Sequence, residues 1–242
     1  MRRITVDKNV LARRFSRSMA TYEQAAVVQR EMAAQLVASL RPVSCKDVFG
    51  RVLELGCGTG LLTERLLDNY RPSRLILNDL VAECERTANC VRRRNPGVIV
   101  KFVQGDMETV EFPYPQDLIV SSSVFQWAEN PQGLLTRMAA FLRPGGVLAV
   151  ASFGPSNLRE VSQLTGLSLS YWSVEKWRTK LAEHYEVISG RENMRKLWFS
   201  SAREVLRHLK QTGVNSLYSR PWTPARLLRF LRTYETTFGR QG

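Results

Sequence analysis

The stretch Glu54-Leu55-Gly56-Cys57-Gly58-Thr59-Gly60 decides the fold that we predict for this chain. The segment R-V-L-E-L at 51–55 predicts a β-strand, and residues 61–69 predict a helix directly after the loop. Glycines at such a junction let the backbone turn sharply and approach a ligand closely. The helix start adds free N–H donors. The stretch therefore predicts a strand–loop–helix unit that holds a nucleotide-like ligand.

The order of elements around this loop predicts an α/β fold with a doubly wound, Rossmann-like sheet. Helices are expected at about 81–94 and from Asn130-Pro131 to a turn at 143–146. Further short apolar strands are expected at 74–78, 98–103, 117–121 and 146–153. Short, nearly continuous apolar strands that alternate with helices are typical of a parallel sheet covered on both faces.

The segments on either side of this core are predicted to be mostly helical. Asp7 is expected to cap a helix over 7–19, and Thr21 with Gln24 forms a capping-box pattern for a helix over 21–40. Later segments are predicted as helices at 156–165, 173–183, 201–212 and 223–234, with extended pieces inside 185–199.

We interpret residues 1–242 as a single domain with three parts. Residues 1–40 would form a helical lid and residues 48–153 the cofactor-binding core. Residues 154–242 would form a helical cap on the substrate side together with the remaining sheet.

The spacing of the glycines separates two classes of cofactor. The dinucleotide pattern G-x-G-x-x-G would need glycine where Leu61 stands. The spacing E-x-G-x-G-x-G instead resembles motif I of class I methyltransferases, which implies S-adenosylmethionine as the cofactor. This cofactor carries a sulfonium and no pyrophosphate, so no basic phosphate clamp is expected.

Two aspartates at later strand ends support this interpretation. Asp79 closes the second strand, 19 residues after Gly60, where a carboxylate can accept both ribose hydroxyls. Asp106 follows the third strand, where class I methyltransferases place an acid near the adenine amino group. Taken singly, either aspartate could be a helix cap. The predicted cofactor-binding residues are Glu54, Gly56, Cys57, Gly58, Gly60, Asp79, Leu80, Asp106, Met107 and Ser122.

The segment 121–127 after the fourth strand bears on the methyl acceptor. It lacks the Asn/Asp-Pro-Pro-aromatic motif of adenine amino-methyltransferases and the cysteine nucleophile of pyrimidine C5 enzymes. No histidine or glutamate stands at the strand end as a general base. A carboxylate acceptor is ionised at neutral pH and needs no base. The segment therefore favours a carboxyl O-methyltransferase.

Further motifs occur along the whole chain. Motifs shared with many small-molecule methyltransferases are S-S-x-x-Q-W at 122–127 and L-R-P-G-G at 142–146. More specific are the F-S-R-x-x-x-x-Y-E-Q segment at 15–24, and L-W-F at 197–199 followed by L-R-x-L-K-x-x-G at 206–213. With these motifs the whole chain resembles the malonyl-acyl-carrier-protein O-methyltransferases of biotin synthesis. Family members continue with a further strand of the form L-T-Y-H, for which we find no candidate before Gly242.

This resemblance implies a substrate and roles for further residues. The acceptor would be the free carboxyl of a malonyl group on an acidic acyl-carrier protein. Gln126 and Trp127 would line the acyl channel, and Tyr22 would sit on the lid over the cofactor. Arg207 or Lys210 would hold the malonyl carboxylate, unless they are simply solvated side chains of a helix.

The distribution of charge fits an acidic partner. Residues 1–20 carry a net charge of +5 and residues 191–242 carry +8, whereas the middle of the chain is neutral. Such basic ends suit an acidic protein, and they also leave open an RNA methyltransferase or a purely solubilising surface. A methyltransferase of another small acid or of a quinone precursor shares every cofactor motif. We expect no stable nucleic-acid partner.

The remaining composition excludes other classes. No apolar run approaches the roughly 20 residues that span a bilayer, so no membrane partner is expected. The four cysteines form no C-x-x-C pair and there are only two histidines, so no metal site is expected. Reduced thiols indicate a cytoplasmic protein. Acidic residues at 54, 79 and 106 argue against a binding module that has lost its cofactor.

Overall fold

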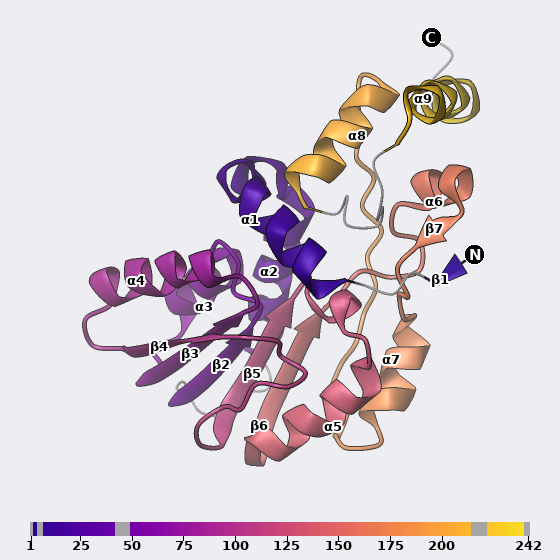
Figure 1. Cartoon of the computed structure of the whole chain (residues 1–242). Helices are drawn as coiled ribbons and strands as arrows, with labels where there is room; N and C mark the ends of the chain where they lie inside the picture. The colour runs from indigo at the N-terminus through magenta and orange to yellow at the C-terminus, as the bar shows by residue number, and fades with distance from the viewer. Residues whose placement is uncertain (1, 4–6, 42–48, 214–221, 240–242) are drawn as a thin grey trace.

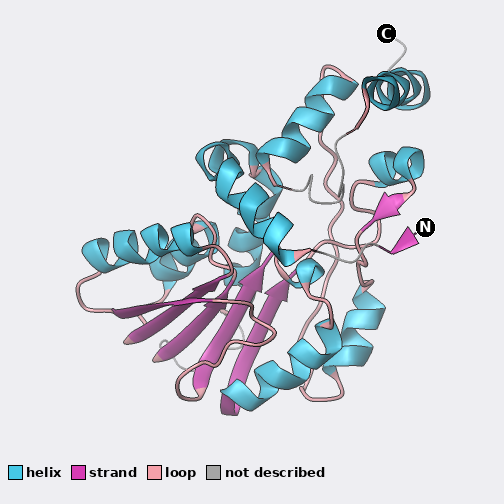
Figure 2. Cartoon of the chain, viewed as in Figure 1, coloured by secondary structure: helices cyan, strands magenta, loops and turns pink. Residues whose placement is uncertain are grey.

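The computed structural model describes residues 2–3, 7–41, 49–213 and 222–239. Its core is a five-stranded, all-parallel sheet in the order β4-β3-β2-β5-β6 (Figures 1 and 2). The strands are β2 (Arg51–Leu55), β3 (Arg74–Asp79), β4 (Ile99–Gln104), β5 (Gln116–Ser122) and β6 (Leu142–Ala151). The strand order reverses between β2 and β5, so ligands are expected beyond the carboxyl ends of these two strands. The predicted doubly wound α/β fold is confirmed.

Alternate residues of each strand enter two different cores. Val52 of β2 packs with α2 (Val27–Ser39), α3 (Leu61–Asn69) and α4 (Glu85–Arg94) on one face. Its neighbour Leu53 faces α5 (Pro131–Phe141) and α7 (Val174–Leu181) on the other. Side chains of a strand point alternately to opposite faces, so a run that is apolar throughout becomes buried on both sides.

The helices outside these layers lie above the carboxyl edge of the sheet (Figure 1). They are α1 (Lys8–Ala25), α6 (Arg159–Thr165), α8 (Ala202–Gln211) and α9 (Pro224–Phe238). The last three share a small apolar cluster of their own, built on Val161, Val205, Leu209 and Phe230. The short strands β1 (Arg2–Arg3) and β7 (Leu167–Ser168) pair in parallel. Two short 3₁₀ helices, η1 (Ala82–Cys84) and η2 (Phe125–Trp127), follow β3 and β5.

Most predicted helix starts are confirmed by their caps. Asp7 accepts hydrogen bonds from the backbone N–H groups of Asn9 and Val10 at the start of α1. Asn130, Ser201 and Thr223 cap α5, α8 and α9 in the same way. A short polar side chain before a helix satisfies donors that have no intrahelical partner.

The predicted boundary at Thr21 is wrong. α1 continues to Ala25, and the Thr21 hydroxyl donates to the carbonyl of Ser18 inside the helix, at 3.1 Å. The break falls at Ala26, whose N–H still bonds to the carbonyl of Tyr22. The hydroxyl of a threonine can bond back into its own helix as well as cap the next one, and local sequence does not distinguish the two.

Two further expectations need correction. Residues 185–199 contain no strand, and most of them are exposed. A strand needs a neighbour for its backbone hydrogen bonds, and within the described residues no strand of the main sheet lies beyond β6. The turn expected at 143–146 is instead the irregular start of β6, with a register shift opposite β5 and a left-handed Gly145. Across all helices that the structure describes, not one is both long and apolar enough to span a bilayer.

Candidate active site

The glycine loop forms the floor of a pocket at the switch point of the sheet. Gly56, Gly58 and Gly60 all have positive φ angles, of 68°, 50° and 98°, which side chains other than glycine adopt at a cost. Gly60 then starts α3. A Cβ atom on Gly56 would lie 2.3 Å from Cγ2 of Val124, so the loop and the segment after β5 fit without spare room.

Asp79 lies directly across from this loop. One of its carboxylate oxygens accepts from the N–H of Gly58 at 2.8 Å and the other from the N–H of Val81 at 2.9 Å. Burial raises the pKa of Asp79, although the backbone donors at Val81 and Gly58 oppose that shift. The carboxylate is therefore fixed at the carboxyl end of β3, where the sequence placed the ribose contact.

Glu54 is a second buried carboxyl group beneath the loop. It is 1% exposed, and it accepts a hydrogen bond from the Thr63 hydroxyl at 2.7 Å. Burial raises its pKa to about 8, against the opposing effect of that hydrogen bond. Neither Glu54 nor Asp79 contacts a basic side chain among the residues that the structure describes. The floor of the pocket therefore suits a ligand that carries positive charge and hydroxyl donors.

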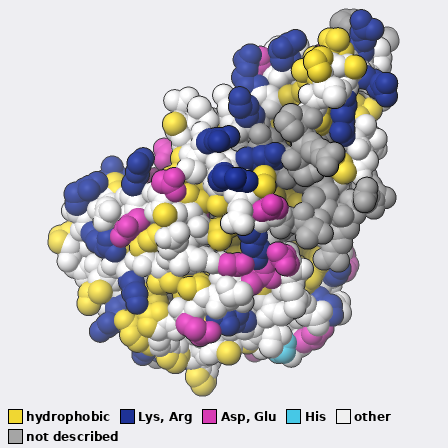
Figure 3. Space-filling model, viewed as in Figure 1, with side chains coloured by type: hydrophobic (Ala, Val, Ile, Leu, Met, Phe, Trp, Pro, Cys, Tyr) yellow, Lys and Arg dark blue, Asp and Glu magenta, His cyan; other side chains and the backbone are white. Residues whose placement is uncertain are grey.

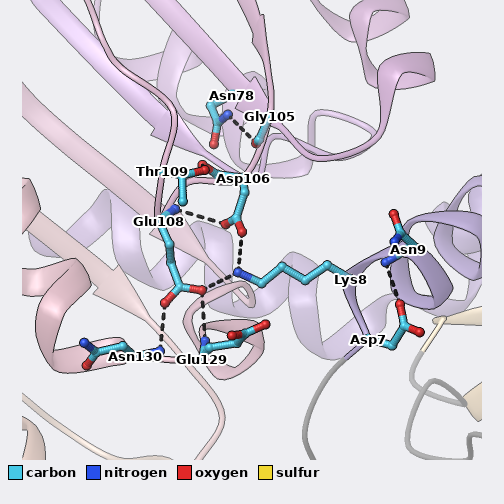
Figure 4. Close-up of polar contacts among 10 residues, drawn as sticks. All are labelled: Asp7, Lys8, Asn9, Asn78, Gly105, Asp106, Glu108, Thr109, Glu129 and Asn130. Carbon is cyan, nitrogen blue, oxygen red and sulfur yellow. Dashed lines mark hydrogen bonds and ion pairs between the residues drawn. The ribbon is translucent and has the colours of Figure 1, made fainter.

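Asp106 enters the pocket from the turn after β4. The amide of Asn78 holds that turn by donating to the carbonyls of Val103 and Gly105, at 2.9 and 3.0 Å. Figure 4 shows that the Asp106 carboxylate is contacted from the opposite side by Lys8 of α1. Lys8 was not predicted from the sequence, because its partners lie about a hundred residues away.

The segment after β5 supplies a further wall of the pocket, the acceptor wall, which the sequence predicts to face the methyl acceptor. Ser122 ends the strand, and its buried hydroxyl has no hydrogen-bond partner among the described residues. Gln126 is held at both ends: its amide donates to the Ser123 carbonyl at 2.6 Å, and its oxygen accepts from Ser152 at 3.4 Å. Gln126 and Trp127 both line the pocket.

Helices α1 and α2 close the pocket from above. Tyr22 packs edge-on against Phe15, with ring centroids 5.2 Å apart. Burial, followed by the charge of Asp79, raises the pKa of Tyr22, so the phenol stays neutral. Gln29 is 8% exposed and lines the pocket. It offers a ligand both a donor and an acceptor.

The structure brings together most of the residues predicted from the sequence. The following line one pocket: Tyr22, Glu54, Gly56, Cys57, Gly58, Asp79, Leu80, Asp106, Met107, Ser122, Gln126 and Trp127. Gly60, also predicted to bind the cofactor, is the N-cap of α3 and does not line the pocket.

Arg207 and Lys210 are not brought to this pocket. Both lie on the exposed side of α8 and neither lines the pocket. The Arg207 guanidinium contacts the Glu204 carboxylate at 2.7 Å, and its side chain remains 58% exposed. The helical spacing of this segment places the two cations on the side opposite its buried residues Val205 and Leu209.

Several pocket residues were missed in the sequence, namely Lys8, Gln29, Phe153, Thr212 and Gly213. They come from the lid helices, from the end of β6 and from the end of α8. Lys8, Gln29 and Phe153 have no motif around them. Thr212 and Gly213 belong to the segment 206–213, but only the packing of these elements over the sheet shows that they line the pocket.

The residues present fit S-adenosylmethionine. Two buried hydroxyls of the pocket, on Thr59 and Ser122, have no partner within the described structure, and a bound cofactor would supply one. A Cβ atom on Gly58 would come within 3.3 Å of the Phe15 ring, so glycine leaves room there for a ligand between loop and lid. The described residues contain no cluster of His, Cys, Asp or Glu able to hold a metal ion.

Comparison with known proteins agrees with this site. Residues 53–150 match the family model of the methyltransferase domain. A malonyl-[acyl-carrier protein] O-methyltransferase of Chlorobium phaeovibrioides is 39% identical over 237 residues, which cover 98% of this chain and 91% of that protein. The enzyme of the same name from Haemophilus ducreyi is 39% identical over 232 residues, covering 96% and 90%.

A solved structure extends the likeness to the fold. It is a chain of the complex between the Haloferax volcanii Trm112 methyltransferase activator and a methyltransferase. It superposes with a TM-score of 0.62 at 18% identity and covers 93% of each chain. The cofactor is S-adenosylmethionine, and this chain belongs to the malonyl-[acyl-carrier protein] O-methyltransferase family of S-adenosylmethionine-dependent methyltransferases.

Proposed function

We propose that this enzyme transfers the methyl group of S-adenosylmethionine to the free carboxylate of a malonyl thioester on acyl-carrier protein, an early step of biotin synthesis. The observation that carries this proposal is the extent of the match to the curated enzymes of that name, over nearly the whole of both chains. The lack of a general base on the acceptor wall supports it. The described lining includes no histidine, and its carboxylates lie among the cofactor-binding residues.

Methyl transfer requires the protein to align the acceptor carboxylate with the methyl group of the cofactor. When bound, the cofactor supplies an activated methyl group on a sulfonium. Gln126 and Trp127 are held on the acceptor wall beside Ser122, so they would orient the malonyl end toward that methyl group. The malonyl carboxylate is ionised at neutral pH, and the wall needs to exclude water and fix the approach. The neutral Tyr22 phenol and the Phe15 ring would close the site from the lid side.

The basic ends of the chain would serve the carrier protein. Lys and Arg side chains gather on the face formed by α1, α8 and α9 (Figure 3). Arg207 and Lys210 are exposed on α8 and lie outside the pocket. We assign them to the acidic surface of the carrier, and no longer to the malonyl carboxylate. Complementary charge of this kind speeds association and weakens as salt screens it.

The parts of the domain take roles in the same scheme. Residues 1–40 would act as the lid over the cofactor, residues 48–153 as the cofactor-binding core, and residues 154–242 as the cap on which the carrier docks. Cys57, Cys84 and Cys90 are free thiols, which agrees with a cytoplasmic site of action, and Cys45 lies outside the described residues.

Incubation with a donor tritiated on its methyl group tests the proposal. We expect label in malonyl-loaded carrier protein, little in the unloaded carrier and none in RNA. Arms with malonyl-coenzyme A and with a free quinone precursor measure how much the carrier contributes. Label that appears only in RNA or only in the quinone precursor would refute the assignment. Labelling of malonyl-coenzyme A as fast as the loaded carrier would refute the docking role of the basic face.

A further inference from the structure

Lys8 is the first residue of α1, and it bridges two carboxylates of the core. Its ammonium group donates to Asp106 in the turn after β4 and to Glu108 two residues later (Figure 4). All three side chains are mostly buried, with exposed fractions of 19%, 25% and 12% for Lys8, Asp106 and Glu108. The contact therefore joins the start of the lid to the core in a partly desolvated setting, where an ion pair is screened weakly.

Glu108 passes this connection on to the acceptor wall. One of its oxygens, which also contacts Lys8, accepts from the N–H of Glu129 at 2.9 Å. The other accepts from the N–H of Asn130 at 2.8 Å. Figure 4 shows Glu129 and Asn130 beside Glu108. Asn130 caps α5, and η2 with Gln126 and Trp127 precedes it in the chain. Lys8 and Glu108 thus connect three parts of the protein at one point: the start of the lid helix α1, the turn after β4, and the segment between the acceptor wall and α5.

Electrostatics make Lys8 essential to this arrangement. Burial alone would lower the pKa of Lys8, but its hydrogen bonds to Asp106 and Glu108 and their charges outweigh that effect and raise it. Without the ammonium group, two carboxylates would face each other with no cation between them. Removing one partner of a buried ionic group is costly because the charge left behind has no compensation.

The other contacts of α1 lie further along the helix. Ser16 donates to Glu83 at 2.6 Å in an exposed position, and α1 packs against α8. Close to Lys8, the residues Leu11, Ala12 and Phe15 form the lid wall of the cofactor pocket. Among the described contacts, the ion pairs of Lys8 are the ones that attach the first turn of α1 to the core.

We propose that Lys8 is a positioning residue that clasps the lid over the cofactor and sets how slowly the cofactor leaves. The assignment rests on S-adenosylmethionine as the ligand of this pocket and does not depend on which acceptor is methylated. Because Lys8 contacts Asp106 and Glu108 at once, it fixes the position of the lid relative to the turn after β4 and to the acceptor wall.

Loss of the clasp is therefore expected to change ligand release without changing the stability of the rest of the protein. Loss of the clasp speeds release of S-adenosylmethionine and of the product S-adenosylhomocysteine, because both are enclosed by the same wall. An effect of about tenfold corresponds to the loss of a single hydrogen bond to a charged group. The opening is local to α1, so the helices on the far side of the glycine loop stay as stable as before.

Stopped-flow release of S-adenosylhomocysteine from the full chain tests this with three variants. Lys8→Met is expected to release the ligand about tenfold faster than the parent. Lys8→Arg retains the charge and is expected to stay within a few-fold of the parent. The matched control is Lys101→Met, which removes the same charge from an exposed position on β4 and leaves release unchanged.

Amide hydrogen exchange on the same samples separates a clasp from a general loss of stability. Lys8→Met is expected to speed exchange over residues 8–25 and to leave α4 unchanged. Parental release from Lys8→Met, or equal acceleration by Lys101→Met, would overturn the proposal. Faster exchange throughout the sheet would overturn it as well, since it would assign Lys8 to global folding. No carrier protein takes part, so these outcomes stay distinct from those of the methylation assay.

Discussion

Substitution of Gly56 by alanine tests the fit of the cofactor loop. The residue has a φ of 68°, in the left-handed region. An added Cβ atom would lie 2.3 and 2.8 Å from the two methyl carbons of Val124 and 3.1 Å from its Cβ. Carbon atoms in contact prefer about 3.5–4.0 Å. Two separate penalties therefore apply to Gly56→Ala, one from the backbone and one from the overlap.

The two penalties can be sized separately. The left-handed backbone costs about 1–2 kcal/mol for a residue with a Cβ atom. Overpacking costs about 1–3 kcal/mol. Gly56→Ala is thus expected to lower the free energy of unfolding by about 2–5 kcal/mol. Val124→Ala alone should lower it by about 1–2 kcal/mol through the loss of two partly buried methyl groups. In the double variant both overlapping methyl carbons are gone. The backbone penalty and the lost methyls remain, together with the milder approach of 3.1 Å to the Cβ atom that alanine keeps at position 124.

Urea unfolding of the parent, both single variants and the double variant measures the coupling. The double variant should be about 1–3 kcal/mol more stable than the sum of the single effects. Gly97→Ala is the matched control, since its φ is ordinary and an added Cβ would meet nothing within 4 Å. It should stay within about 1 kcal/mol of the parent. Strictly additive effects at positions 56 and 124 would refute the overlap, and the fit of loop to wall with it.

Three further predictions concern the charged residues. Asp79→Asn places an amide where the carboxylate accepts hydrogen bonds from the N–H groups of Gly58 and Val81. Calorimetry should then show that the affinity for the cofactor is at least about tenfold weaker. Unchanged affinity would show that Asp79 does not bind the cofactor. Burial raises the pKa of Glu54 to about 8, so the folded protein keeps a proton that the unfolded chain releases, and stability falls as pH rises toward that value. Glu54→Gln should remove this loss. In urea unfolding, the free energy of unfolding of the variant relative to the parent should therefore increase between pH 5 and about pH 8. A difference in free energy that stays constant with pH would contradict the raised pKa. The double substitution Arg207→Glu and Lys210→Glu should slow methylation of the loaded carrier about tenfold at low salt. The affinity for the cofactor, measured by calorimetry, should stay unchanged, because neither residue lines the pocket. Loss of cofactor binding would contradict this placement.

Much of the cofactor site was predictable because its determinants are local. Gly56, Gly58 and Gly60 need backbone angles that only glycine adopts easily, and this requirement is visible in the sequence itself. Asp79 and Asp106 follow directly from strand periodicity, since parallel strands bring their carboxyl ends to one edge. The helix caps at Asp7 and Asn130 are short-range hydrogen bonds for the same reason.

The substrate side was less predictable. A helical segment with alternating charges can present any of its cations to a pocket or to solvent, and for Arg207 and Lys210 the packing of Val205 and Leu209 decides this. Residues 185–199 have a strand-like composition, but a strand also needs a partner, which the described sheet does not offer there. These outcomes depend on neighbours that are distant in the chain.

The sequence by itself determined the doubly wound sheet, the glycine loop and the carboxylates that line the pocket beside it. Each of these follows from periodicity or from the conformational needs of single residues. Only the tertiary structure decided how the lid is held and which cations face solvent. Lys8 meets Asp106 and Glu108 across about a hundred residues, and an ion pair of that range depends on where helices pack over the sheet. No local pattern encodes such a meeting, because the attraction acts through space and not along the chain.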